Sequence, residues 1–160
     1  HGLRDYHGEP HRVQSIAIVK DVEYVDDSKG TNVGATVAAL NGLGSNESGK
    51  RIWLIAGGDG KGQDFSPLRE PALRFVKGAF LIGKDGDAIA HALGENISCT
   101  VSGNLVAALQ AAAAKAVSGD LVLLSPACAS LDQFKDYVER AQVFAAEVEE
   151  LGMRFEGVQA

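Results

Sequence analysis

The chain has 160 residues, of which 46% are hydrophobic and 22% are charged, so it matches one globular domain and excludes a second domain of ordinary size. Its net charge of −6 argues against sequence-independent binding of nucleic acid, which needs clustered Lys and Arg side chains. No stretch approaches the roughly 20 apolar residues of a membrane helix, and the N-terminus has no apolar signal-peptide core. We therefore expect a soluble, cytoplasmic monomer without membrane insertion.

Two further expectations come from the cysteines and the first residue. Cys99 and Cys128 are too few for a disulfide framework, and no histidine accompanies them at metal-ligand spacing, so we expect two reduced thiols and no metal site. The chain begins at His1 without an initiator methionine, so we expect it to be part of a longer protein.

The first half of the chain reads as a strand pair followed by alternating helices and strands. Residues 12–19 are β-branched and apolar, a Lys20-Asp21 turn follows, and residues 22–26 predict a second strand. Apolar residues at helical spacing between 33 and 40 predict a helix. The run 52–55 predicts a third strand, and residues 67–75 predict a short helix.

The second half repeats this alternation. Residues 79–82 predict a strand and are followed by a helix through Ile89 and Leu93. Residues 99–101 predict another strand, followed by an alanine-rich helix with Leu105 and Leu109 on one face. After a last strand at 121–124, a final helix is expected to carry an apolar stripe from Phe134 to Val148 and to end at Gly152, with residues 153–160 as a tail.

Short, continuous apolar runs separated by amphipathic helices are typical of strands that are buried on both faces of a sheet. The pattern predicts an α/β, Rossmann-like fold: a mostly parallel sheet of about six strands with helices on both faces and an antiparallel first strand pair. Residues 1–160 are interpreted as a single domain, in which 1–11 are the remnant of a linker.

Ligands of open parallel sheets bind at the carboxyl ends of the strands, and three loops at that edge carry unusual polar groups. They span residues 26–32, 57–62 and 125–130. Lys29 and Lys61 supply positive charge, Thr31 and Ser130 supply hydroxyl donors, and the glycines leave backbone amides accessible. Together these groups predict a site for carboxylates or phosphates.

Each loop also has a structural interpretation that the sequence leaves open. Asp27 and Ser28 could cap the helix that begins near Asn32, and residues 57–62 could form a tight turn. The glycine loop is not a Walker A motif, because Lys61 is followed by Gly62 instead of Ser or Thr. Cys128 reads more readily as a buried filler than as a reactive thiol.

His7 and His11 are interpreted as solvated side chains rather than metal ligands, because no acidic partner stands at ligand spacing. In the final helix, the stripe residues are expected to be core, with Tyr137 free to direct its hydroxyl to the cleft.

Four segments taken together resemble the C-terminal domain of the D-glutamate-adding branch of the Mur ligase family. They are Pro10-His11-Arg12, DDSKGTN at 26–32, GGDGKGQDFSPL at 57–68 and LLSPACASLDQFKDY at 123–137. The resemblance covers nearly the whole chain, and the four motifs occur in the order of the family. It implies a ligase of peptidoglycan synthesis whose N-terminal UDP-substrate domain and central ATP-binding domain are absent from this chain.

The resemblance implies a reaction in which ATP phosphorylates the carboxylate of UDP-N-acetylmuramoyl-L-alanine and the amine of D-glutamate then displaces phosphate. Thr31 and Lys61 would bind the α-carboxylate of D-glutamate, while Ser130, Leu131 and the backbone near Tyr137 would bind its side-chain carboxylate.

For the nucleotide, the resemblance implies that Asp27 and Arg12 contact the ribose of ATP and that His11 lies near the adenine. Lys29 would be the catalytic residue that reaches the phosphates as the domains close. Mg²⁺ would be held mostly by the absent domains, and the isolated domain would be inactive.

The chain departs from the family pattern at Gly30, where alanine is commoner, and at Tyr137, where phenylalanine is commoner. Two alternatives stay open: a non-catalytic ligand-binding or interaction module of the same fold, and another amino-acid ligase such as a folylpolyglutamate-type enzyme.

Overall fold

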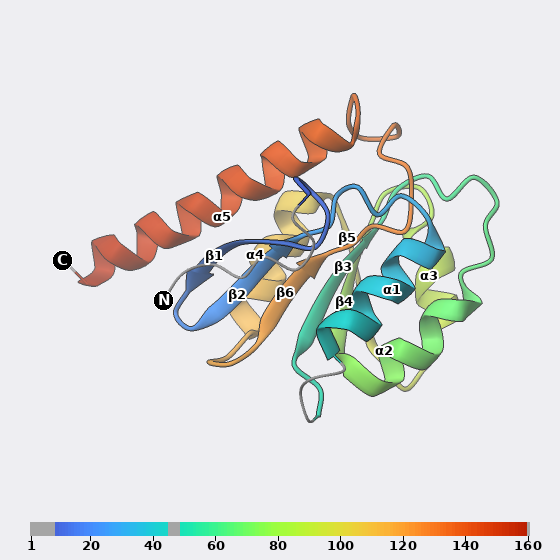
Figure 1. Cartoon of the computed structure of the whole chain (residues 1–160), viewed down its shortest axis with the longest axis horizontal. Coiled ribbons are helices and arrows are strands. Elements are labelled where there is room, and N and C mark those ends of the chain that lie inside the picture. Colours follow the sequence, from blue (N-terminus) through green and yellow to red (C-terminus); the bar gives the residue numbers. More distant parts are fainter. Residues whose placement is uncertain (1–8, 45–48, 160) are drawn as a thin grey trace.

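The computed structural model describes residues 9–44 and 49–159 of the chain, which form an α/β fold around one sheet (Figure 1). Residues 1–8 of the predicted linker, including His7, lie outside the described residues. In chain order the elements are β1 (Gln14–Val19), β2 (Val22–Asp26), α1 (Val33–Gly44), β3 (Ile52–Gly57), the 3₁₀ helix η1 (Ser66–Leu68), α2 (Arg69–Phe75), β4 (Val76–Ile82), α3 (Gly86–Leu93), β5 (Ser98–Gly103), α4 (Leu105–Lys115), β6 (Leu121–Leu124) and α5 (Tyr137–Gln159).

The six strands are ordered β1-β2-β6-β3-β4-β5, with β1 antiparallel to β2 and every other neighbouring pair parallel. This arrangement confirms the predicted fold class. The strands β2 and β6 are buried along their whole length, as continuous apolar runs predict for inner strands of a parallel sheet, whereas the edge strand β5 is largely exposed.

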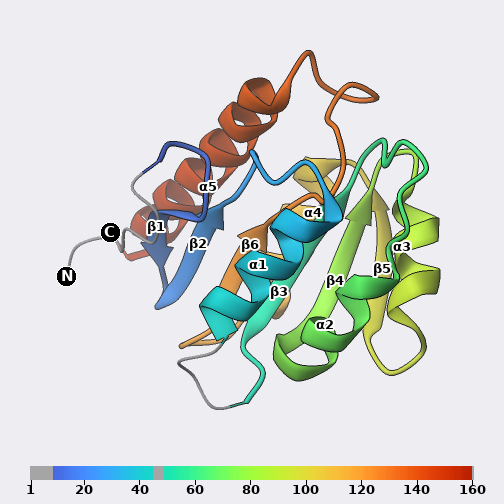
Figure 2. The ribbon, with the colours of Figure 1, turned by 45° about the vertical axis from the view of Figure 1, so that its right-hand side comes forward.

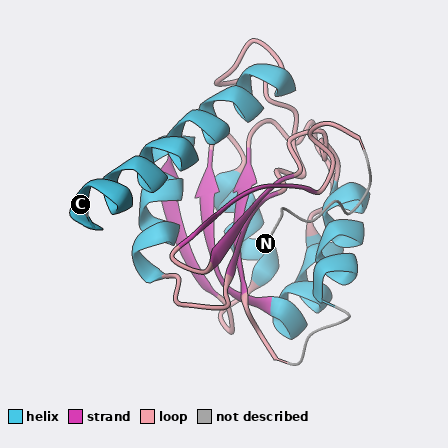
Figure 3. Ribbon diagram, turned by 60° about the vertical axis from the view of Figure 1, so that its left-hand side comes forward, coloured by secondary structure: helices cyan, strands magenta, loops and turns pink. Residues whose placement is uncertain are grey.

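Helices cover both faces of the sheet, as Figure 3 shows. One apolar core lies between the sheet and α1, α2 and α3, and includes Leu40, Leu54 and Leu81. A second core lies between the sheet and α4 and α5, and includes Leu109 and Phe144. Among the described residues, no helix is both long enough and apolar enough to cross a membrane.

The last helix differs from the sequence prediction at both ends. It begins at Tyr137 rather than Phe134, because the Asp136 carboxylate accepts a hydrogen bond from Glu139 N at 2.9 Å and Glu139 accepts one from Lys135 N at 2.9 Å. These reciprocal contacts resemble a capping box and fix the start of the helix. Phe134 still packs against the second core from the preceding turn.

The predicted end of this helix at Gly152 is wrong, since α5 continues to Gln159 and residues 153–159 are helical. Gly152 instead lies on the side of α5 that faces β1, where a Cβ atom would be 3.8 Å from Val19 Cγ2. A single glycine costs a helix only about 1 kcal/mol, so packing against β1 is enough to carry the helix past it.

Candidate functional site

The loops after β2, β3 and β6 meet at one end of the sheet, shown at the top of Figure 2. Backbone hydrogen bonds join them: Ala127 N donates to Gly30 O at 3.0 Å, and Asp59 and Ala129 exchange two bonds at 3.0 and 2.9 Å. The three loops that the sequence singled out therefore form one continuous surface.

Gly58 allows this close approach. Its φ is +132°, and a Cβ atom would lie 2.4 Å from Ala129 O, so a residue with a side chain would both strain the backbone and push the two loops apart. The loop from 57 to 62 is thus more than a turn, because its glycine packs directly against the loop after β6.

Thr31 and Lys61 line one pocket of about 360 Å³ at this end of the sheet. Its described lining is completed by Asn32, Asp59, Gly60, Gln63 and Ala129. Lys61 is exposed and has a φ of +52°, and its backbone N donates to Asp59 Oδ1 at 2.9 Å, so the ammonium group stands on a loop with a fixed backbone. A cation and a hydroxyl side by side can bind a small carboxylate.

Gln63 fixes the shape of this pocket, although the sequence did not predict a role for this residue. Its side-chain oxygen accepts a hydrogen bond from Val33 N at 2.8 Å, and its amide nitrogen donates to Gly60 O at 3.0 Å and Ala127 O at 2.9 Å. One amide therefore joins the start of α1 to the loops after β3 and β6. The available signal was its position directly after the glycine loop, where an amide can satisfy backbone donors and acceptors together.

Ser130 and Leu131 follow Ala129 but do not line the pocket that contains Thr31 and Lys61. The Ser130 side chain is buried, with 4% of the residue exposed, and its carbonyl accepts hydrogen bonds from Gln133 N and Phe134 N. Leu131 is 63% exposed. The structure therefore places the two predicted halves of the D-glutamate site side by side without joining them.

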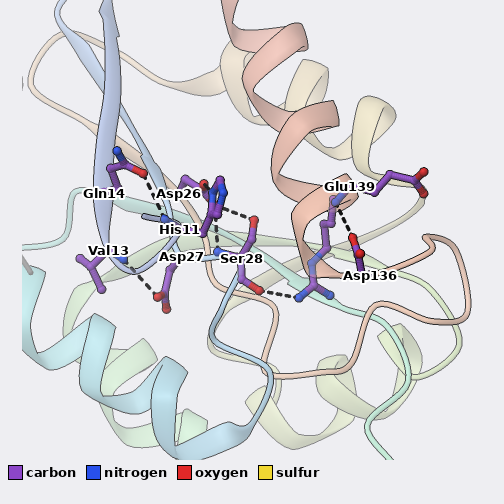
Figure 4. Close-up of polar contacts among 9 residues, drawn as sticks. His11, Val13, Gln14, Asp26, Asp27, Ser28, Asp136 and Glu139 are labelled. Atoms are coloured by element: carbon purple, nitrogen blue, oxygen red, sulfur yellow. Dashed lines mark hydrogen bonds and ion pairs between the residues drawn. The ribbon is translucent and has the colours of Figure 1, made fainter. Parts of the chain in front are cut away.

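Tyr137 lies with the predicted nucleotide residues instead. Its ring meets the His11 ring edge-on, with 6.3 Å between centroids. His11 Nδ1 is 2.8 Å from Asp26 Oδ2, and the other Asp26 oxygen accepts hydrogen bonds from Ser28 Oγ at 2.5 Å and Ser28 N at 2.8 Å (Figure 4). Asp26 thus holds the His11 imidazole in one orientation.

Arg12 and Lys29 converge on a single anion of the chain itself. Arg12 Nε is 3.5 Å and Lys29 Nζ is 3.3 Å from the same carboxylate oxygen, Glu9 Oε2. All three side chains are substantially exposed to solvent. The two cations therefore already share one anion position, which a phosphate group could take in exchange for Glu9.

Asp27 is directed into the fold rather than toward solvent, with 2% of the residue exposed. Its carboxylate accepts hydrogen bonds from Val13 N at 3.2 Å and Ser125 Oγ at 2.6 Å. Burial raises its pKa to about 6, against the lowering effect of these two hydrogen bonds. It does not cap α1, since Asn32 Oδ1 accepts the hydrogen bond from Ala35 N at 2.9 Å.

The structure explains why residue 30 is glycine. A Cβ atom there would lie 2.6 Å from Asp27 Oδ2, so alanine would displace the carboxylate from its bond to Ser125. The buried position of the Asp27 carboxylate therefore depends on glycine at position 30.

Arg140 has one of the largest fully buried side chains, with 1% of the residue exposed, and the sequence did not predict a role for it. From the first turns of α5 it donates to Ser28 O at 2.7 Å and to Cys128 O at 3.1 Å, and Nε has no hydrogen-bond partner. It thus joins the loop after β2 to the loop after β6. A charged residue in the apolar stripe of a helix was the signal that could have revealed it.

Cys128 beside it is fully buried, and burial raises its thiol pKa to about 12. A thiol in this state is almost entirely protonated at neutral pH and is a poor nucleophile. The filler interpretation of Cys128 therefore agrees with the structure.

Replacing Arg140 by methionine is expected to lower the free energy of unfolding by about 2 to 4 kcal/mol, because two buried carbonyl groups lose their donor. Urea unfolding followed by circular dichroism measures this change. Arg154→Met, on the same helix but exposed and ion-paired with exposed Glu150, should cost less than about 1 kcal/mol. Equal losses in the two variants would contradict the role assigned to Arg140.

The raised pKa of Asp27 predicts a specific pH dependence. The folded state binds this proton more strongly than the unfolded state, so the stabilising contribution is complete below the ordinary carboxyl pKa of 3.8 and is lost as pH rises through the folded pKa of about 6. Between pH 4 and pH 7, the free energy of unfolding in urea should fall by about 2 to 3 kcal/mol more in the parent chain than in Asp27→Asn. The control is Asp87→Asn, at an exposed site. A constant difference between parent and Asp27→Asn across this range would refute the assignment.

Comparison with known proteins shows the family to which the chain belongs. The family model described as the glutamate ligase domain of Mur ligases matches residues 11–128. A UDP-N-acetylmuramoylalanine-D-glutamate ligase from Cupriavidus metallidurans is 56% identical over 154 residues, which cover 96% of this chain and 30% of the relative. A ligase of the same name from Ralstonia nicotianae is 59% identical over 145 residues, which cover 90% of this chain and 28% of the relative. The chain thus spans about 30% of the length of these relatives.

Solved structures show the same fold at low sequence identity. A murein peptide ligase from Psychrobacter arcticus superposes with a TM-score of 0.58 at 17% identity, over 85% of this chain and 30% of that one. A domain of a UDP-N-acetylmuramate ligase from Haemophilus ducreyi superposes with a TM-score of 0.59 at 14% identity, over 90% of this chain and 99% of that one. The family match, the two ligase relatives and the shared fold confirm the resemblance in the sequence: the chain belongs to the Mur ligase family, in which it is a glutamate ligase domain.

Proposed function

We propose that this chain is the C-terminal domain of an ATP-dependent ligase that adds D-glutamate to UDP-N-acetylmuramoyl-L-alanine during peptidoglycan synthesis in the cytoplasm. The observation that carries the proposal is the pocket in which Thr31 and the exposed Lys61 lie together at the carboxyl edge of the sheet. The ligase names of relatives at 56% and 59% identity supply the substrate.

The Thr31 and Lys61 pocket suits one carboxylate of D-glutamate. The Lys61 ammonium supplies the charge and the Thr31 hydroxyl supplies a directed donor. Hydrogen bonds to a charged group contribute about 1.5 to 3 kcal/mol each, which is enough to orient a small amino acid. The second carboxylate would meet Ser130 and the segment that leads to Tyr137. Because Ser130 is 4% exposed, this contact requires the 129–136 segment to move.

Arg12 and Lys29 suit the phosphates of ATP, which would replace the Glu9 carboxylate between them. His11, held by Asp26 and flanked by Tyr137, offers a fixed ring to the nucleobase. Asp27 is engaged with Val13 and Ser125, so its role here is to hold the loop that presents Lys29, and a ribose contact would require that loop to open. Mg²⁺ and the nucleotide-binding glycine loop belong to the other domains of the full-length enzyme.

Kinetics of the full-length ligase test the carboxylate assignment. Lys61→Ala should reduce kcat/KM for D-glutamate about 100-fold, equivalent to roughly 3 kcal/mol, because a charge-assisted contact to the substrate is lost. KM for the UDP-linked substrate should stay within about twofold. Phosphate release at varied D-glutamate measures both values.

The matched control is Lys84→Ala, an exposed lysine of the neighbouring β4–α3 loop that does not line the pocket, and it should leave the kinetics unchanged. Unchanged D-glutamate kinetics in Lys61→Ala would remove the carboxylate assignment. The 160-residue chain alone should release no phosphate from ATP in the presence of both other substrates. Turnover by this chain alone would show that the missing domains are unnecessary and would overturn the proposed division of the active site.

A further inference from the structure

The backbone amides of residues 59–61, in the glycine loop after β3, all donate to partners within the chain. Asp59 N donates to Ala129 O at 3.0 Å, and Lys61 N donates to Asp59 Oδ1 at 2.9 Å. Between them, Gly60 N donates to Asp85 Oδ2 at 2.7 Å. These amides are therefore engaged in fixing the loop, and the Lys61 ammonium group is the donor that the loop offers to a ligand.

Asp85 reaches this loop from a neighbouring one. It is half-buried in the loop between β4 and α3 and does not line the pocket that contains Lys61, whereas Gly60 does. Besides the carboxylate bond to Gly60, Asp85 N donates to Gly58 O at 2.9 Å. Backbone and side chain of one residue thus bond to both ends of the turn from 58 to 60. Asp85 can therefore affect the pocket only through the glycine loop.

The place of Asp85 in α3 makes this contact informative. Asp85 is the N-cap residue of α3, and its carbonyl accepts a hydrogen bond from Ile89 N at 3.1 Å. An aspartate at this position normally accepts hydrogen bonds from backbone amides in the first turn of its own helix. In the described structure of α3 the Asp85 side chain makes no such bond. Its carboxylate instead bonds to Gly60, 25 residues earlier in the chain, at the expense of a local stabilising contact.

The residue that follows Gly60 has a backbone conformation that needs support. Lys61 has a φ of +52°, in the left-handed region that residues with a side chain rarely adopt, and such a conformation persists only where surrounding contacts determine it. Gly60 fits closely, since a Cβ atom there would overlap the Phe65 ring and lie 3.3 Å from Asp85 Oδ2. Loss of the Asp85 bond should therefore release the backbone directly before Lys61.

We propose that Asp85 is a positioning residue of the D-glutamate site, which holds the Lys61 ammonium group where a substrate carboxylate can meet it. The inference rests on the proposed function, because it concerns the same site. It adds a residue that does not touch the substrate and that acts on substrate binding only through Lys61.

Kinetics of the full-length ligase at varied D-glutamate test this role. Asp85→Ala should raise KM for D-glutamate about tenfold and leave kcat and KM for ATP within about twofold, because the ground state and the transition state lose the same contact. Asp85→Asn keeps an oxygen that can accept from Gly60 N, so its KM should stay within about threefold of the parent value. The matched control is Asp87→Ala, an exposed carboxylate in the first turn of α3, which should leave KM unchanged.

Two further variants separate positioning from a general loss of stability. Asp85→Ser has a shorter side chain that can cap α3, so it should raise KM as Asp85→Ala does while keeping the start of the helix stable. If Asp85 acts through Lys61, adding Asp85→Ala to Lys61→Ala should lower kcat/KM for D-glutamate by less than about twofold further. Independent action would multiply the two losses to roughly 1,000-fold. Thermal melts followed by circular dichroism establish that each variant is folded at the assay temperature.

Three results would overturn the proposal: an unchanged KM for D-glutamate in both Asp85→Ala and Asp85→Ser, an Asp85→Asn variant as impaired as Asp85→Ala, or multiplied losses in the double variant. Failure of the proposed function looks different. In that case the parent ligase itself would release phosphate without any dependence on D-glutamate.

Discussion

The functional end of this domain depends on one buried guanidinium group. Arg140 extends from α5 into the space between two loops and donates to a backbone carbonyl of each. Burial lowers its pKa to about 10, so the group stays charged at neutral pH even though it is almost fully removed from water. Because its hydrogen-bond partners are carbonyl groups, the position of α5 and the conformation of both loops are determined together.

Buried arginine is costly unless its donors are satisfied and negative charge lies near. The carboxylates of Asp26, Asp27 and Asp132 all favour the charged form of Arg140 electrostatically. Two of these belong to the segment that also carries Lys29 and Thr31. The acidic residues at the start of that segment therefore have a structural role, in which they stabilise the cation that fixes their own loop.

Much of the architecture could be predicted from the sequence because it depends on local patterns. The inner strands β3, β4 and β6 are short apolar runs, and such runs are stable only when both faces are covered. The clustering of three polar loops followed from topology, since the ends of parallel strands share one edge. The Lys20-Asp21 turn followed from the short gap between two β-branched runs.

What could not be predicted depends on contacts between distant segments. Tyr137 was expected beside the D-glutamate residues, but the start of α5 is set by Asp136 and Glu139, and this places the ring against His11. Asp27 looked like a cap or a ligand contact, yet Ser125, 98 residues further along, holds its carboxylate inside the fold. Residue spacing could not predict either contact, because each joins segments that lie far apart in the sequence.

The two halves of the proposed D-glutamate site differ in how firmly they are held. The Thr31 and Lys61 half is fixed by Gln63, which bonds to backbone atoms of two loops and of the first residue of α1. The Ser130 half lies on the segment between Cys128, which Arg140 contacts, and Asp136, which begins α5. A movement that exposes the Ser130 hydroxyl would displace the 129–136 segment, which lies between the Arg140 contact at Cys128 and the start of α5. A ligand with two carboxylates is bound well only when both halves are in place, so the position of this segment relative to α5 sets the span between carboxylates that the domain can accept.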